Sequence, residues 1–169
     1  NVIFEEERDL WIDSITETCN NNDVDFKISQ HPRDKGDLSR YQQQLIASSS
    51  ASVSDQIANS HFIVTRFSSL IHEGLLQYKP VIYYNPHGEK MQYNFRFNNE
   101  FLFLCKDKDE IDQALKVILN TSINKKSIDE YITNHCLPYI GSPSENINEL
   151  LTKAVFKQGS FGSRELIHS

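Results

Sequence analysis

HFIVTRFSSLIHEGLLQYKPVIYYN, residues 61–85, is the segment from which the fold of this chain can be inferred. It contains two β-branched and aromatic runs, at 62–64 and 81–84, and both are typical of buried strands. Apolar residues between these runs recur at helical spacing, which indicates a helix with one face packed on the sheet. These residues are Leu70, Ile71, Gly74, Leu75 and Tyr78. Two buried strands joined by one helix predict a βαβ unit with a right-handed crossover.

The turn between the first strand and this helix is the first candidate site. It carries Arg66, Ser68 and Ser69 at the point where a parallel strand ends and its helix begins. Free N–H groups and the helix dipole favour an anion at such a point, and two hydroxyls could complete a phosphate site. Alternatively, a serine only caps the helix. Arg66 could likewise neutralise phosphate or pair with an acidic side chain.

The length and composition narrow the class of protein. The chain has 169 residues, a hydrophobic share of 38% and a net charge of −6. We therefore expect a single domain at 1–159 with its own core, followed by a loose tail at 160–169. The negative charge argues against a surface that coats nucleic acid. No apolar run approaches the roughly 20 residues of a membrane helix, so no membrane span is expected.

The cysteines and the first residues bear on the compartment. Cys19, Cys105 and Cys136 are odd in number and far apart, and they form no C-x-x-C pair. Neither a zinc site nor a disulfide framework is expected from this spacing. The chain also lacks a signal-peptide pattern. Both observations favour a reducing cytoplasm.

Strands and helices alternate on both sides of the central unit. Before it we predict a helix at 7–20, a strand at 24–29, a polar surface loop at 35–44, a weak strand at 45–47 and a short helix capped by Ser52 or Ser54. After it we predict an irregular segment at 91–100, a strand at 101–105 and three helices that begin near Asp107, Ser127 and Ser142. This order indicates an α/β fold: a Rossmann-like open, mostly parallel sheet flanked by helices, with a helical C-terminal tail.

Three polar clusters directly follow predicted strands. They are His31-Pro32-Arg33, the turn from Arg66 to Ser69, and the loop from Asn85 to Lys90, which holds His87 and Glu89. Ligands of open α/β sheets bind outside the carboxyl ends of the strands, so we expect the clusters to share one crevice. Glu73 lies one helical turn after Ser69 and could reach back toward the same edge.

At this point the chain resembles a known family. The ordered segments KISQHPRD (27–34), IVTRFSSLIHEGLLQYKPVIYYN (63–85) and NPHGEK (85–90) are similar to the donor-binding, C-terminal half of GT-B glycosyltransferases, roughly over residues 24–120. The resemblance is to bacterial enzymes of capsule and surface-polysaccharide synthesis, including those that use CMP-activated sialic acid or Kdo. Their His-Pro and Ser-Ser motifs, similar to contacts for the nucleotide phosphate, match His31-Pro32 and Ser68-Ser69. Their ribose-binding glutamate matches Glu73.

The resemblance implies a metal-independent glycosyltransferase with a CMP- or UDP-linked sugar as donor substrate and no other cofactor. His31 would be the catalytic group, because a preorganised donor stabilises the charge of the departing nucleotide. The other contacts would come from Pro32, Arg33, Arg66, Ser68, Ser69, Glu73, His87 and Glu89. An N-terminal domain or a partner subunit would hold the glycan acceptor and supply the base. Alone, this chain would then be inactive.

Each candidate also has a structural alternative. His31 could cap a strand through a ring-to-backbone bond, and Glu73 could be a solvated helix residue. His87 and Glu89 lie in a loop that could cover the sugar or simply be solvated. We expect His72 to be a packed or exposed helix residue rather than a metal ligand, since no second ligand has zinc-site spacing.

Other assignments stay open as well. The aromatic residues Tyr93, Phe95 and Phe97 could stack on a base, although packing against the sheet is favoured. The chain could belong to another sugar-nucleotide enzyme, such as an epimerase or a pyruvyl transferase. It could also be a non-catalytic nucleotide-binding module.

Overall fold

The computed structural model describes residues 5–31, 35–46, 52–66, 68–90 and 95–135, with only the backbone of residues 5, 6 and 68. It divides into two compact units, Asn1–Asp129 and Glu130–Ser169. In the second unit, the described residues are the end of one helix, where the Tyr131 and His135 rings meet edge to face with centroids 4.7 Å apart. The prediction of one domain over 1–159 with a tail at 160–169 stays a prediction.

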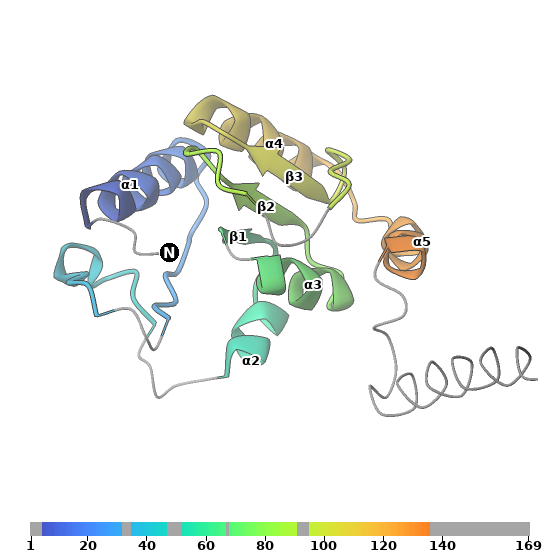
Figure 1. Ribbon diagram of the computed structural model, residues 1–169, viewed down its shortest axis with the longest axis horizontal. Coiled ribbons are helices and arrows are strands. Elements are labelled where there is room, and N and C mark those ends of the chain that lie inside the picture. The colour runs from blue at the N-terminus through green and yellow to red at the C-terminus, as the bar shows by residue number, and fades with distance from the viewer. Residues whose placement is uncertain (1–4, 32–34, 47–51, 67, 91–94, 136–169) are drawn as a thin grey trace, which may run out of the picture. The chain divides into compact units, whose positions relative to one another are not determined.

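The first unit is built on an open sheet of three parallel strands (Figure 1). They are β1 (Ile63–Thr65), β2 (Val81–Tyr84) and β3 (Leu102–Cys105), in the order β1-β2-β3. All four residues of β2 are buried, as expected for a central parallel strand covered on both faces. The predicted Rossmann-like α/β fold, with its parallel sheet and flanking helices, is confirmed.

Helix α3 (Ser68–Leu76) connects β1 to β2 and packs closely on both strands. Two of its own residues, Ile71 and Leu75, are fully buried. Gly74 allows the close approach, because a Cβ atom there would lie 2.7 Å from Ile63 Cδ1 and 2.8 Å from Val81 Cγ2. The sheet and Gly74 thus fix the height of α3 above β1 and β2, and with it the position of the first turn of the helix.

The carboxyl end of α3 is closed by a Schellman motif. The Lys79 N–H donates to the Gly74 carbonyl at 2.9 Å, across Tyr78, whose φ of +56° is the left-handed position that glycine usually takes. The Tyr78 side chain accounts for this choice of residue. Its hydroxyl donates to Asp129 at 2.9 Å, and the Lys125 ammonium lies 5.1 Å from its ring centroid.

Two helix pairs cover the sheet of the first unit (Figure 1). Helices α1 (Glu5–Asn21) and α4 (Lys108–Asn120) pack together on one face, and α3 lies on the other face beside α2 (Val53–Ala58). Nine buried residues form the core between α1, α4 and the sheet: Ile15, Cys19, Ile82, Tyr84, Phe103, Cys105, Ile111, Ala114 and Leu115. Among the described residues, no helix is both long and apolar enough to cross a membrane.

The chain between α1 and α2 differs from its prediction. In place of strands at 24–29 and 45–47, the described residues there form only an isolated parallel bridge between Ile28 and Leu45. The segment predicted as a polar surface loop holds the short 3₁₀ helix η1 (Ser39–Tyr41), and Leu38 and Tyr41 are buried. These two side chains pack with Ile12 of α1, so burial of apolar surface decides the local structure.

The predicted helix starts are partly confirmed. Ser52 caps α2 with a capping box, and the Asp107 side chain accepts from the Glu110 N–H at 2.9 Å to cap α4. Helix α5 (Lys125–His135) begins before Ser127, so the predicted cap there is wrong. The Asn124 side chain accepts from the Ser127 N–H at 3.3 Å instead. The helix predicted to begin near Ser142 lies outside the described residues.

Two buried cysteines give a first testable consequence. Cys19 and Cys105 are free thiols in the core, and burial raises the pKa of Cys19 to about 11 and that of Cys105 to about 12. Because the thiolate is the nucleophile, native protein near neutral pH should react with iodoacetamide at both sites far more slowly than urea-unfolded protein. Peptide mass spectrometry measures this directly. Equal labelling of native and unfolded protein at Cys105 would contradict the burial described above.

Candidate functional site

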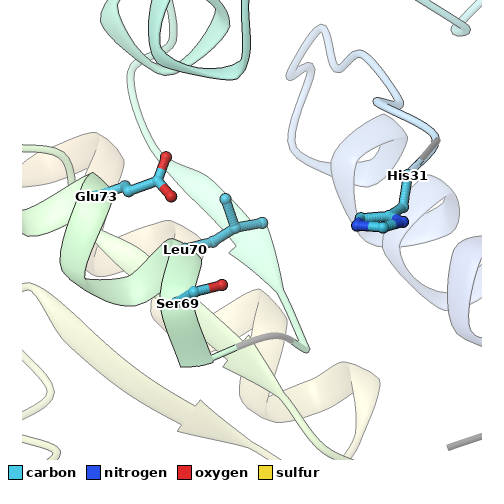
Figure 2. A pocket seen from close by; sticks show the side chains of 4 residues that line it. All are labelled: His31, Ser69, Leu70 and Glu73. Atoms are coloured by element: carbon cyan, nitrogen blue, oxygen red, sulfur yellow. The ribbon is translucent and has the colours of Figure 1, made fainter. Parts of the chain in front are cut away.

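A cleft that holds three polar side chains lies beside the first turns of α3. It has a volume of about 280 Å³, and its described lining consists of His31, Ser69, Leu70 and Glu73. Figure 2 shows Ser69, Leu70 and Glu73 on one side of the cleft, all from α3, and His31 on the opposite side. His31 lies between α1 and η1, far from α3 in the sequence. Folding therefore brings together three of the residues that the sequence nominates.

The chemistry of this cleft follows from its position on α3. Ser69 lies in the first turn, where backbone N–H groups lack acceptors within the helix and the helix dipole favours negative charge. Glu73 lies one turn further along and can accept hydrogen bonds from hydroxyl groups. His31 can donate a hydrogen bond or carry a positive charge. The arrangement suits a ligand that joins an anionic group to hydroxyl groups.

The remaining predicted site residues are placed as follows. Pro32, Arg33 and the side chain of Ser68 lie outside the described part of the structure. His87 is exposed in the loop after β2, and it is not part of the described cleft lining. Within the described ranges, no group of three His, Cys, Asp or Glu side chains could hold a metal ion. The roles predicted for these residues stay predictions.

Arg66 and Glu89, which the sequence nominates separately, form an ion pair. The Nη2 group of Arg66, at the end of β1, donates to Oε1 of Glu89 in the loop after β2. The Arg66 side chain is only 8% exposed and that of Glu89 is 28% exposed. Of the two readings of Arg66, pairing with an acid is therefore the one observed. Glu89 is engaged in this pair rather than simply solvated.

The loop that carries Glu89 is held by Asn85, which begins the third polar cluster of the sequence but is not predicted to be a site residue. The Asn85 side chain is buried, donates to the Glu89 carbonyl at 2.9 Å and accepts from the Glu89 N–H at 2.8 Å. Gly88 has a φ of +65°, which glycine adopts without strain. An Asn-Pro start followed by a glycine is a turn signal, so this closed loop could have been anticipated. The ion pair of Glu89 with Arg66, which follows the neighbouring strand, could not have been anticipated.

Aromatic packing surrounds β2 and α3. The Tyr83 and Phe97 rings stack with centroids 6.2 Å apart, and the His72 and Phe95 centroids lie 5.0 Å apart. Burial raises the pKa of Tyr83, and the nearby Glu89 charge raises it further. Burial lowers the pKa of His72. Phe97 thus packs against the sheet, as favoured from the sequence, whereas Phe95 packs against His72 of α3, and Tyr93 lies outside the described residues.

Comparisons with models of known protein families, with curated protein sequences and with solved structures gave no match. The fold and the cleft define the class: an α/β domain with an open parallel sheet and a cleft at the start of α3. Any more specific assignment is a proposal that depends on the chemistry of this cleft.

Proposed function

We propose that this chain is the nucleotide-sugar-binding domain of a metal-independent GT-B glycosyltransferase that acts in bacterial surface polysaccharide or glycan synthesis. One observation carries the proposal: His31 faces Ser69 and Glu73 across a single cleft. These residues belong to the His-Pro motif, the Ser-Ser motif and the ribose-binding glutamate of the family that the sequence resembles. Residues that match three motifs, each with its own role, could therefore contact one nucleotide sugar at the same time.

The proposed donor substrate is a CMP- or UDP-linked sugar. When the bond between the sugar and the phosphate oxygen breaks, negative charge develops on the departing nucleotide. His31, the Ser69 hydroxyl and the amides of the first turn of α3 would donate hydrogen bonds to this charge, and one such donor can contribute about 3–4 kcal/mol. Glu73 would accept hydrogen bonds from the ribose hydroxyls. The acceptor glycan and the base would come from another domain or subunit in the cytoplasm.

Nucleotide titration followed by NMR tests this proposal. CMP and UDP should shift the backbone signals of His31, Ser69 and Glu73, because these residues line the cleft. Cytidine is the matched control, since it lacks the phosphate that the helix terminus is expected to bind. It should cause smaller shifts at Ser69 at the same concentration. Shifts confined to the amino ends of the strands, near His61 and Pro80, would contradict the proposal.

A further inference from the structure

Arg66 has an unused hydrogen-bond donor in a buried place. Its Nη2 group is paired with Glu89, but Nη1 is also buried and has no hydrogen-bond partner in the part of the chain that the structure describes. Buried donors in native proteins are nearly always satisfied, so this one needs an explanation. An arginine presents its donors in a planar fork that matches the oxygens of carboxylates and phosphates. The unpaired Nη1 is therefore a place for an acceptor from outside the described chain.

Glu89, the partner of Arg66 Nη2, is held in place by hydrogen bonds between its backbone and Asn85. The Asn85 side chain bonds to both the N–H and the carbonyl of Glu89, so the backbone that carries the carboxylate is fixed from two directions. The Asn85 N–H donates to the Cys105 carbonyl at 2.8 Å, which ties the start of this loop to β3. A chain of contacts thus runs from β3 through Asn85 and Glu89 to Arg66.

Glu89 also makes the buried arginine tolerable when no ligand is present. An unpaired charge in such a place is strongly unfavourable, whereas an ion pair is much less so. The Arg66–Glu89 ion pair has no net charge. An anion would therefore be held by hydrogen bonds from Nη1 more than by long-range electrostatic attraction. The orientation of the Arg66 guanidinium depends on the hydrogen-bond acceptor that residue 89 supplies.

We propose that Asn85 and Glu89 are positioning residues that hold the Arg66 guanidinium by Nη2, so that Nη1 binds an oxygen of a phosphate group. The proposal deepens the function proposed above, because the nucleotide phosphate would be the source of that oxygen. It assigns Glu89 a role other than contact with the sugar. Glu89 stays on Arg66 while the anion binds.

The rival arrangement is an exchange, in which the anion displaces Glu89 from Arg66. Two uncharged variants at position 89 distinguish this exchange from the proposed arrangement. Glu89→Gln keeps a hydrogen-bond acceptor and Glu89→Ala removes it, while both remove the same charge. If Glu89 orients Arg66, Glu89→Ala should bind inorganic phosphate about tenfold more weakly than Glu89→Gln, the typical effect of one hydrogen bond. If the anion displaces Glu89, the two variants should bind phosphate equally and both more tightly than the wild type.

A double-mutant cycle tests whether the effect passes through Arg66. In an Arg66→Ala background, the difference between the Gln and Ala variants at position 89 should vanish. A difference that persists there would show that residue 89 acts only on the loop, and would overturn the proposal. Binding is measured by NMR titration with inorganic phosphate, after circular dichroism has verified that each variant is folded.

The wild-type protein provides a second readout, which decides the matter even if Glu89→Ala does not fold. The guanidinium ¹⁵N signals of Arg66, assigned by their loss in Arg66→Lys, should show distinct Nη1 and Nη2 resonances. Inorganic phosphate should shift Nη1 more than Nη2. Equal shifts, or none, would overturn the proposal. If phosphate leaves Arg66 unchanged but CMP still shifts His31 and Ser69, only this inference fails; if phosphate shifts Nη1 but neither CMP nor UDP binds, only the proposed function fails.

Discussion

Leu75→Ala is expected to lower the free energy of unfolding by about 2–5 kcal/mol. Leu75 is fully buried on the face of α3 that packs on β1 and β2. Its removal loses apolar burial and leaves a cavity that the tightly packed helix cannot fill, because Gly74 already places α3 close to Ile63 and Val81. Domains are stable by only about 5–15 kcal/mol, so a large fraction of the stability would be lost. Urea unfolding followed by circular dichroism measures the change.

The matched control is the next residue of the same helix. Leu76 is 56% exposed, so Leu76→Ala should change the free energy of unfolding by no more than about 0.5 kcal/mol. The two variants share the substitution and the helix and differ in burial alone. Equal losses from both would mean that α3 does not pack on the sheet as described, and the site built on its first turn would lose its basis.

His31→Ala is expected to weaken CMP binding by about tenfold to a hundredfold. A hydrogen bond from a charged donor to phosphate is typically worth about 1.5–3 kcal/mol, against about 0.5–1.5 for a neutral one. Ser69→Ala should therefore weaken binding less, since the amides of the α3 terminus remain. Calorimetric titration of CMP into the wild type, His31→Ala and Ser69→Ala gives the comparison.

His61→Ala is the control for the loss of a histidine from the surface. His61 is exposed and precedes β1, so it lies at the amino end of the strand, away from the first turn of α3. It should leave CMP affinity within about twofold of the wild type, as expected for a surface position without a ligand contact. Should His31→Ala also bind CMP like the wild type, His31 has a structural role only, and the phosphate site loses its most important residue.

The centre of the fold can be predicted from the sequence because local and tertiary preferences agree there. The runs at 62–64 and 81–84 are β-branched and aromatic, the residues between them have helical spacing, and the structure forms β1, α3 and β2 from them. The caps of α2 and α4 follow for the same reason: Ser52 and Asp107 bond to backbone amides a few residues away. Such interactions are local in the chain, so their signals are too.

The sequence-based predictions are wrong or incomplete where the structure depends on a partner that is distant in the sequence. Val24, Phe26 and Ile28 alternate like a strand, and Val24 and Phe26 do pack against the core, but alternation says nothing about which strand would pair with their backbone. The site shows the same limit. Arg66 and Glu89 are each nominated by position after a strand, yet their pairing depends on how the segments after two neighbouring strands meet. His31 lines the cleft from the segment between α1 and η1, far from α3 in the sequence.

The pairing of α1 with α4 has a consequence for how the protein is made. Lys108 of α4 donates to Glu17 of α1 at 2.9 Å, and Asn22, directly after α1, donates to Asp112 of α4 at 2.8 Å, across 91 and 90 residues of sequence. Ribosomes add about 5–20 residues per second, so α1 is synthesised seconds before β3 and α4 exist. Most of the stability of a helix in a protein comes from tertiary packing, and the part of the apolar face of α1 that packs on α4 and the sheet has no partner during that interval. β3 and α4, which are made later, therefore complete the core for α1, which is made earlier.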